Sequence, residues 1–371
     1  MKILMLNYEF PPLGGGASPV SYEIAKGYAG LGHTVDVVTM GYKNLPAFEQ
    51  KDGINIYRVK CWRSKKEICH PWEQLTYIIA AKRFLKKHLK GHSYDINHTH
   101  FIIPTGIISL WLKKKYNLPY IITSHGSDVP GYNLGRFKTL HKFTRPTLRK
   151  ILNNSKVAVA GSKFLADLAD KVILANKKYV VIRQGFDFNK FEPQEKKKII
   201  LSTGRLLERK GFQYLIRAVA DEDIGYEVHI CGDGPMMAEL RRLATQSRTK
   251  IIFHGWLDNN SRYYKTLLET AAIYCLVSAK ENASVALLES MSAGCAVITS
   301  NVAGCPESVR DAGIIVEPEN AAALTRVLKE LINNPNKVLE LGKMARARIE
   351  NDYNWNNIIN EYKNILTKSH F

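Results

Sequence analysis

Short apolar stretches alternate with longer amphipathic stretches along almost the whole chain, and this alternation limits the fold more than any other feature. In the first half, we expect helices at residues 19–31, 72–90, 105–115, 137–153 and 163–169, between strands at residues 2–7, 34–39, 54–59, 95–99, 120–123, 157–160 and 180–183. Strands and helices that alternate in this way form a parallel sheet covered on both faces. The first half is therefore expected to be one α/β domain.

The alternation is interrupted at residues 187–198 and then resumes. The interrupting segment contains Pro193 and a Glu-Lys-Lys-Lys run, which are typical of a linker. Beyond it we expect a second series of strands, at residues 199–203, 227–230, 250–254, 272–276, 296–300 and 313–316. A length of 371 residues suits two domains. We expect an α/β protein with two Rossmann-like domains and a cleft between them, residues 1–190 and 191–350, followed by a helix within 351–371 that crosses back to the first domain.

Two glutamates eight positions apart mark the second domain. Glu281 follows the expected strand 272–276, and Glu289 lies in a helix that we expect to begin near Ser284. Open α/β sheets bind ligands at the carboxyl ends of their strands. Two carboxylates at that edge suit the hydroxyl groups of a sugar and of a ribose. The helix N-terminus between them, at Ser284 and Val285, can take a phosphate.

The Glu-x7-Glu spacing resembles the signature of retaining glycosyltransferases of the GT4 type, and other motifs extend the resemblance over nearly the whole chain. They are Pro-Pro-Leu-Gly-Gly-Gly at 11–16, His-Gly-Ser-Asp at 125–128, Gly-Arg-Leu-Leu-Glu-Arg-Lys-Gly at 204–211, Gly-Asp-Gly-Pro at 232–235, His-Gly-Trp at 254–256 and Tyr-Asn-Trp at 353–355. Each motif is weak alone, but their order and spacing make the set specific. The resemblance implies the GT-B fold, in which two Rossmann-like domains face each other, and sugar transfer from a nucleotide sugar.

Two basic residues, Arg205 and Lys210, follow the first expected strand of the second domain. Arginine offers a planar fork to a diphosphate, and lysine offers a point charge. The resemblance implies that these two residues neutralise the departing nucleoside diphosphate. We therefore expect catalysis without a metal ion and without a cofactor. The Asp-x-Asp run at Asp221 and Asp223 has no apolar strand before it, so we interpret it as a solvated loop and not as a metal site.

The first domain contributes two further groups of candidate residues. Gly15 and Gly16 follow the first expected strand and precede a helix, where glycine lets backbone N–H groups approach a phosphate. His125 follows the expected strand 120–123, and this place favours a substrate contact over a core histidine. The resemblance implies that His125 meets the donor sugar or the reacting centre. Asp128 is expected to orient His125 or to bind the acceptor.

The sequence leaves the identity of the donor open. The resemblance places the backbone around His254 against the nucleotide base, whereas Trp256 either packs under the base or belongs to the core. Many relatives read Glu-Gly-Phe-Gly where this chain reads Glu-Asn-Ala-Ser at 281–284, and this departure bears on the donor sugar. We expect a hexose-type sugar carried by UDP or GDP, without a choice between the two.

Lysine and arginine are concentrated in the first half of the chain. Residues 1–190 hold 30 Lys and Arg and 12 Asp and Glu, a net charge of +18, whereas residues 191–371 have a net charge of +1. Such an excess bears on partners and not on the fold. Basic and apolar residues occur together in the expected helices 72–90 and 137–153, and more lysines follow at 113–115, a pattern that suits an anionic membrane surface. We assign the docking to the helix 136–150.

The location and the acceptor follow from the same features. No apolar run reaches the roughly 18–20 residues that span a bilayer, and the N-terminus shows no signal-peptide cleavage pattern. We expect a cytoplasmic protein, peripheral on the inner face of the cytoplasmic membrane, with a glycan or a lipid-linked molecule as acceptor. Two alternatives stay open. One is an epimerase or hydrolase of nucleotide sugars on the same fold, and the other is a nucleic-acid-binding protein, for which the basic half lacks a recognisable motif.

Overall fold

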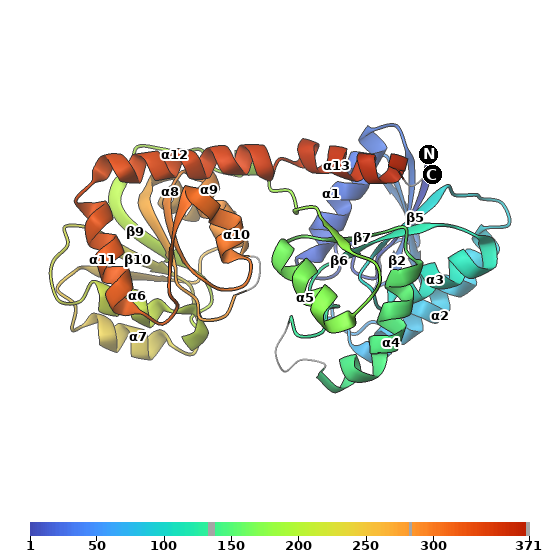
Figure 1. Ribbon diagram of the computed structural model, residues 1–371, viewed down its shortest axis with the longest axis horizontal. Coiled ribbons are helices and arrows are strands. Elements are labelled where there is room, and N and C mark those ends of the chain that lie inside the picture. Colours follow the sequence, from blue (N-terminus) through green and yellow to red (C-terminus); the bar gives the residue numbers. More distant parts are fainter. Residues whose placement is uncertain (133–137, 282–283, 369–371) are drawn as a thin grey trace. The chain divides into compact units, whose positions relative to one another are not determined.

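The computed structural model describes residues 1–132, 138–281 and 284–368, whose helices and strands form two compact units (Figure 1). Unit 1 comprises Met1–Gly185 and Trp355–Phe371, and unit 2 comprises Phe186–Asn354. Each unit is built around one sheet, as the two series of expected strands predict. The fold class is therefore α/β with two Rossmann-like sheets.

Unit 1 contains an eight-stranded sheet with the order β3-β4-β2-β1-β5-β6-β7-β8. The strands are β1 (Lys2–Leu6), β2 (Thr34–Met40), β3 (Phe48–Lys51), β4 (Ile54–Val59), β5 (Ile96–His100), β6 (Tyr120–Ser124), β7 (Val157–Ala160) and β8 (Tyr179–Val181). All neighbouring pairs are parallel except β3 and β4. Strand β1 pairs with β2 on one side and with β5 on the other. The order in which the chain adds strands to the sheet therefore reverses at β1, from one side to the other.

Six helices cover the two faces of this sheet. They are α1 (Ala17–Gly30), α2 (Pro71–His88), α3 (Thr105–Tyr116), α4 (Lys138–Asn154), α5 (Lys163–Ile173) and α13 (Trp355–Lys368). The core on one face contains side chains of α1 and α13, and the cores on the other face contain side chains of α2 to α5. Helix α13 packs closely on α1, because a Cβ atom on Gly27 would lie only 2.4 Å from the Ile359 side chain.

The antiparallel strand β3 is absent from the sequence-based prediction. Its residues, Phe-Glu-Gln-Lys, lack the apolar run that marks the buried strands, because β3 is an edge strand and is largely exposed. The signal that could have revealed it is the turn at Asp52 and Gly53, which joins β3 to β4. Both turn residues have positive φ, 48° and 76°, as two-residue hairpin turns require.

Unit 2 contains a six-stranded parallel sheet with the order β11-β10-β9-β12-β13-β14. The strands are β9 (Lys197–Thr203), β10 (Glu227–Cys231), β11 (Ile251–Gly255), β12 (Ala271–Leu276), β13 (Ala296–Ser300) and β14 (Gly313–Val316). Strands β12 and β13 are buried along their whole length, which explains why they consist mainly of apolar residues.

The helices of unit 2 form two layers around that sheet. Side chains of α6 (Phe212–Ala218), α7 (Met237–Ala244) and α11 (Ala321–Ile332) enter one core, and those of α8 (Arg262–Thr270), α9 (Val285–Ser292) and α10 (Cys305–Val309) enter the other. Helix α12 (Pro335–Asp352) contributes to both cores. The short 3-10 helices are η1 (Phe188–Lys190), η2 (Glu208–Lys210) and η3 (Arg310–Ala312).

The two units divide a few residues away from the expected limits of 190 and 350. Residues 186–190 belong to unit 2 because Arg346 of α12 donates hydrogen bonds to the carbonyl oxygens of Phe188 and Phe191, both at 2.9 Å. Residues 351–354 also belong to unit 2, since α12 continues to Asp352 and Tyr353 is buried in the same core as α8 and α9.

Candidate active site

A pocket of about 560 Å³ opens in unit 2 at the carboxyl ends of its central strands. Its lining consists of residues that follow β9, β10 and β11, together with residues of α8 and α9: Thr203, Gly204, Arg205, Cys231, Gly232, Asp233, Gly234, Trp256, Leu257, Asn259, Tyr264, Val285, Ala286 and Glu289. Strand β9 pairs with β10 on one side and with β12 on the other, so the pocket lies where the strand order reverses. Ligands of open α/β sheets bind at such points.

The backbone of three glycines lines one part of this pocket. Gly204 and Gly232 have φ of 148° and 151°, and their loops touch, since a Cβ atom on Gly232 would lie 1.8 Å from the Gly204 carbonyl oxygen. A Cβ atom on Gly234 would lie 2.4 Å from the carbonyl oxygen of Leu206. Neither position accepts a side chain, so the pocket is lined by bare backbone at these two loops.

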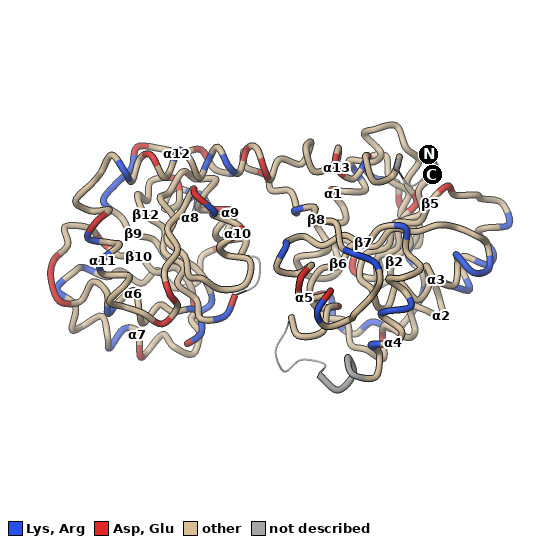
Figure 2. Tube along the Cα trace, in the orientation of Figure 1, with Lys and Arg blue, Asp and Glu red and all other residues tan. Residues whose placement is uncertain are grey.

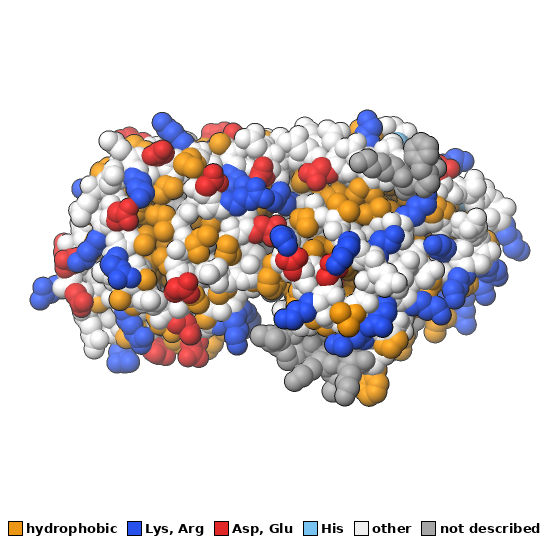
Figure 3. Space-filling view, in the orientation of Figure 1, with side chains coloured by type: hydrophobic (Ala, Val, Ile, Leu, Met, Phe, Trp, Pro, Cys, Tyr) orange, Lys and Arg blue, Asp and Glu red, His pale blue; other side chains and the backbone are white. Residues whose placement is uncertain are grey.

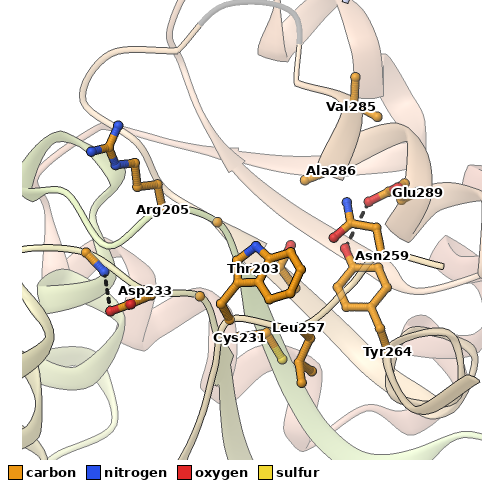
Figure 4. Close-up of a pocket in the computed structure, with 14 residues that line it drawn as sticks. Thr203, Arg205, Cys231, Asp233, Leu257, Asn259, Tyr264, Val285, Ala286 and Glu289 are labelled. Atoms are coloured by element: carbon orange, nitrogen blue, oxygen red, sulfur yellow. Dashed lines mark hydrogen bonds between the residues drawn. The ribbon is translucent and has the colours of Figure 1, made fainter. Parts of the chain in front are cut away.

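Glu289 is a buried carboxylate on the α9 wall of the pocket (Figure 4). The Tyr264 hydroxyl donates a hydrogen bond of 2.9 Å to one carboxylate oxygen, and Lys190 Nζ lies 3.4 Å from the other. Burial and the neighbouring Glu289 raise the pKa of Tyr264, so its hydroxyl stays a donor. Each oxygen of Glu289 retains acceptor capacity for a ligand hydroxyl.

Trp256 and Arg205 are both exposed where they border the pocket. The Trp256 side chain is 74% exposed, which places it outside the core and leaves a large aromatic surface open to the pocket. In Figure 4, Arg205 lies on the side of Asp233, away from Glu289. Among the described residues, none forms a hydrogen bond or ion pair with the Arg205 guanidinium. It is thus a cation available to an anionic ligand.

Lys210 and Glu281 form an ion pair instead of standing apart. Both side chains are mostly buried, and Ser278 Oγ donates to the same Glu281 oxygen at 3.3 Å. The 3-10 helix η2 that carries Lys210 packs tightly on the end of β12, because a Cβ atom on Gly211 would lie 2.1 Å from the Val277 carbonyl oxygen. The pair therefore has a fixed position beside the strand end.

The N-terminus of α9 lies between the two glutamates, as expected. Ser284 has the extended backbone of an N-cap residue, although its side chain makes no capping hydrogen bond, and α9 begins at Val285. Val285 lines the pocket. The departure of this chain from its relatives at residues 282 and 283 lies outside the described residues.

His254 lies on the edge strand β11, in a chain of polar side chains. Its Nε2 is 3.1 Å from His229 Nδ1, and its Nδ1 is 3.1 Å from the Tyr263 hydroxyl. Burial lowers the pKa of His254, so the ring is neutral near pH 7. The side chain is engaged by these neighbours and does not line the pocket, which leaves its backbone for any ligand contact.

In unit 1, Asp128 organises the loop after β6. Its two carboxylate oxygens accept the backbone N–H groups of Ile102, at 2.8 Å, and His125, at 3.0 Å. Burial raises the pKa of Asp128, while these backbone donors oppose the shift. One carboxylate oxygen of Asp128 thus holds the backbone of His125 in place.

His125, which is partly exposed, packs against the buried His100. Its Nε2 lies 2.9 Å from His100 Nδ1, and the two rings are stacked. Burial lowers the pKa of His125 to about 4, so its ring is neutral at physiological pH. A neutral imidazole can donate or accept a hydrogen bond without bringing charge to the site.

Gly15 and Gly16 form the turn between β1 and α1, with Gly16 at the N-cap. A Cβ atom on either residue would meet no atom within 4 Å, so the space above both is open to a ligand. The glycine that the turn itself requires is Gly14, which has φ of 93° and would clash with Glu9 if it carried a side chain.

Within the described parts of the chain, no three His, Cys, Asp or Glu side chains are placed to hold a metal ion. Asp221, Glu222 and Asp223 are exposed, and Asp223 accepts the backbone N–H of Gly225 at 3.0 Å. In the parts of the chain that the structure describes, no helix has both the length and the apolar composition of a membrane-spanning segment.

The chain matches two family models that together span most of its length. Residues 183–348 match the family described as glycosyl transferases group 1, and residues 14–190 match glycosyltransferase family 4. The chain is a family 4 glycosyltransferase. The comparisons give no support to an epimerase, a hydrolase or a nucleic-acid-binding protein.

Individual relatives of this glycosyltransferase agree with the family models. An uncharacterized glycosyltransferase of Methanocaldococcus jannaschii is 28% identical and covers 98% of this chain and 97% of its own. N-acetyl-alpha-D-glucosaminyl L-malate synthase of Bacillus anthracis is 24% identical over 95% of this chain and 94% of its own. Anabaena HepE, solved in complex with UDP, superposes with a TM-score of 0.73 at 16% identity, over 99% of this chain and 100% of its own. These likenesses place this chain in the GT-B fold.

The structure of this glycosyltransferase brings some predicted site residues together and separates others. Arg205, Val285 and Glu289 line one pocket, whereas Lys210, Glu281, Ser284 and His254 are absent from its lining. Gly15, Gly16, His125 and Asp128 belong to unit 1.

Sequence reasoning missed three residues around Glu289. Lys190 and Tyr264 contact its carboxylate, and Asn259 lines the pocket beside it. No sequence pattern marks a single tyrosine in a helix. Lys190 lies in a segment with the composition of a linker, and only its place in η1 brings it to α9.

Proposed function

We propose that this glycosyltransferase moves a hexose-type sugar from a nucleoside-diphosphate sugar to a hydroxyl group of a glycan or lipid-linked acceptor, with retention of the anomeric configuration. The observation that carries the proposal is the unit 2 pocket. It combines a buried acceptor carboxylate, Glu289, bare glycine backbone and an exposed cation, Arg205. A pocket of about 560 Å³ has the size of small-molecule sites.

Each part of the pocket suits one part of the donor. Glu289 accepts the ribose hydroxyls, since Tyr264 and Lys190 hold its orientation and leave it acceptor capacity. Arg205 and the N-terminus of α9 bind the diphosphate. Trp256 offers its exposed ring to the base, because stacking is the contact that every base allows.

The sugar itself is assigned to Glu281, whose carboxylate accepts hydroxyl groups. The Lys210–Glu281 ion pair lets one lysine orient the sugar-binding carboxylate and face the diphosphate at the same time. Lys210 and Arg205 then stabilise the negative charge that develops on the leaving group, and this electrostatic effect replaces a metal ion or other cofactor.

The reaction breaks the bond between the anomeric carbon and the diphosphate oxygen, and the electron pair leaves with the diphosphate. The acceptor hydroxyl attacks the same face, and its proton passes to the departing phosphate oxygen. No enzyme nucleophile is required, and the configuration is retained. For unit 1, the role that we assign to the neutral His125 ring is a hydrogen bond to the donor sugar. The role that we assign to Gly15 and Gly16 is a backbone contact with the phosphates, since no side chain fills the space beside them.

The acceptor and the location belong to the same proposal. The basic excess of unit 1 suits an acceptor on an anionic surface, so we assign acceptor binding to unit 1 and place the enzyme on the inner face of the cytoplasmic membrane. The L-malate synthase named above indicates that a small hydroxy acid is the main competing acceptor class.

A donor panel tests the proposal first. Thermal unfolding of the full chain is measured with UDP, GDP and ADP and with their glucose, mannose and N-acetylglucosamine derivatives, because a ligand that binds the folded state raises the unfolding temperature. UDP is the first candidate, since the Anabaena neighbour was solved with it. The best donor is then incubated with a lipid-linked saccharide or with L-malate. An α-configured product from an α-configured donor supports retention, and an inverted product contradicts it.

A further inference from the structure

One face of α2 is exposed along its length although it carries large apolar side chains. Trp72, Leu75 and Ile79 are 49%, 60% and 52% exposed. Their spacing of three and four residues puts them on one line along the helix. The opposite face supplies the core with Tyr77, Ile78, Ala81 and Leu85. The exposed line is thus additional to what the fold needs.

The same line continues as a row of basic side chains. Arg83, Lys86, Lys87 and Lys90 follow at helical spacing and are exposed. Residues 74–94 contain no Asp or Glu that could pair with them locally. We call the seven residues from Trp72 to Lys90 on this line the α2 stripe: Trp72, Leu75, Ile79, Arg83, Lys86, Lys87 and Lys90. It is apolar in its first half and basic in its second.

Neighbouring segments widen the stripe at both ends. Trp62 is 63% exposed, its ring centroid lies 6.0 Å from that of Trp72, and its backbone N–H donates to Thr76 Oγ1 at 3.0 Å. At the basic end, Lys82 Nζ lies 5.7 Å from the centre of the Trp111 ring in α3. The exposed Lys114 and Lys115 close α3. The surface therefore spans two helices and one loop.

The charge of unit 1 as a whole has the same sign. Its residues include 31 Lys and Arg against 12 Asp and Glu, whereas unit 2 has 22 of each. Figure 2 marks Lys and Arg along α2 and α3, and Figure 3 shows such side chains gathered, with hydrophobic ones among them, over the region of those helices. A large anionic partner is the complement of this surface.

We propose that the α2 stripe lies in the headgroup region of an anionic lipid bilayer, with Trp62, Trp72, Leu75 and Ile79 inserted and the basic half on the lipid phosphates. Tryptophan prefers the membrane–water interface, and a helix with an apolar and a basic portion on one exposed face binds in its plane. The inference rests on the proposed membrane location and names the surface that performs it.

Neither helix-dipole stabilisation nor self-association accounts for the whole stripe. Lysines in the last turn of a helix stabilise its dipole, which explains Lys86 and Lys87 but neither Arg83 nor the exposed apolar residues. A second copy of the chain on this face would bring two strongly basic units together.

The helix to which the sequence analysis assigns the docking is α4. Its Phe143 is 81% exposed, but the side chains of residues 136–142 lie outside the described residues, so docking through α4 stays a prediction.

Three variants of the full chain test the surface by co-sedimentation with vesicles. The vesicles contain phosphatidylcholine alone or phosphatidylcholine with phosphatidylglycerol. One variant reverses Arg83, Lys86 and Lys87 to Glu, a second changes Leu75 and Ile79 to Ser, and a control reverses Lys26, Lys51 and Lys171 to Glu. The control residues are exposed on α1, β3 and α5, so the control makes the same change of net charge elsewhere on unit 1.

Wild-type protein is expected to bind only the anionic vesicles. Each basic residue near such a surface is worth about fivefold in partitioning, so the triple reversal in α2 should weaken binding by about 100-fold or more. The serine variant should weaken it at all salt concentrations, and the control should lose much less. Binding of UDP in unit 2 should be unchanged in all three variants.

Several results would overturn the inference. They are wild-type protein that ignores anionic vesicles at low salt, a control that loses as much binding as the α2 reversal, and self-association in solution that the serine variant abolishes. Failure of the proposed enzymatic function gives a different result, in which vesicle binding persists and no nucleotide diphosphate shifts the unfolding temperature.

Discussion

His100 Nδ1 lies 2.9 Å from His125 Nε2, so one N–H···N hydrogen bond joins the two imidazoles. His100 Nε2 is buried, and no described residue forms a hydrogen bond with it. A buried N–H without an acceptor is rarer and more costly than a buried lone pair, so the His100 proton belongs on Nδ1. His125 Nε2 then accepts the hydrogen bond, and the single N–H proton of the neutral His125 ring lies on Nδ1.

The first prediction concerns stability at acid pH. Burial lowers the pKa of His125 to about 4 and that of His98 to about 3, both below the usual 6.5. Between pH 6.5 and pH 4 the unfolded chain therefore binds more protons than the folded one. The contribution of the two histidines to the free energy of unfolding is complete above pH 6.5. It is lost as the pH falls toward 4, by about 1.4 kcal/mol per pH unit for each histidine.

Urea unfolding across this pH range is the measurement. His125→Gln should reduce the slope of the unfolding free energy against pH by about one proton, and urea unfolding of the wild-type chain over the same pH range gives the reference slope. An unaltered slope in His125→Gln would show that His125 titrates normally in the folded protein.

The second prediction concerns Asp128, which holds the backbone N–H groups of Ile102 and His125. Asp128→Asn turns one acceptor into a donor that faces an N–H, so we expect a loss of about 1–3 kcal/mol in unfolding free energy and a loss of activity through displaced His125. Asp167→Asn, which affects only an exposed ion pair with Lys163, should cost less than about 0.5 kcal/mol. Equal effects of the two substitutions would remove the positioning role from Asp128.

The third prediction separates the two cations assigned to the diphosphate. Arg205→Ala and Lys210→Ala should each lower kcat by about 100-fold or more, the usual cost of losing one electrostatic contact in the transition state. Only Lys210→Ala should also lower the unfolding temperature, because it breaks the largely buried ion pair with Glu281. Arg209→Ala, an exposed neighbour in η2, is the control. Turnover of either folded variant within twofold of wild type contradicts the phosphate role.

The fourth prediction concerns the tyrosine that orients Glu289. Tyr264→Phe removes one buried hydrogen bond to a carboxylate, worth about 1.5–3 kcal/mol, so UDP affinity should fall by about tenfold or more. Tyr263→Phe, on the same helix but exposed, should leave UDP affinity unchanged. Isothermal titration of both variants measures the difference. Unchanged affinity in Tyr264→Phe would place the ribose away from Glu289.

The fifth prediction concerns metal ions. Because two protein cations are assigned to the leaving diphosphate, sugar transfer should continue in the presence of EDTA at the rate measured without it. The assay compares initial rates with EDTA alone and with Mg²⁺ or Mn²⁺ in excess over it. A rate that falls with EDTA and recovers with either ion requires a metal-dependent mechanism.

The order of strands and helices could be predicted from the sequence because burial leaves a direct signature in it. Strands β12 and β13 are covered on both faces, so their residues are apolar except for Thr299 and Ser300 at the end of β13, and Glu289 could be placed on a helix between them. The exposed edge strand β3 lacks this signature. The only sequence signal for β3 is the Asp-Gly pair that forms the turn into β4.

The contacts inside the site could not be predicted in the same way, since they depend on side chains far apart in the sequence. Lys190 and Tyr264 reach Glu289 from η1 and α8. The pairing of Lys210 with Glu281 joins residues that the sequence assigned to different parts of the donor. The type of a residue predicts which hydrogen bonds or ion pairs its side chain can form. The fold decides which other side chain it forms them with.

The two loops that touch at Gly204 and Gly232 also limit how this enzyme can diverge. A side chain at Gly232 or Gly234 would clash with the carbonyl oxygen of Gly204 or Leu206. Substitution at either glycine therefore disrupts the loops and cannot adjust the specificity for the donor. New donor preferences must therefore arise at positions with room for variation, such as Trp256, Asn259 and Val285. Directed evolution of the nucleotide or sugar preference would best randomise these three positions and leave the glycines untouched.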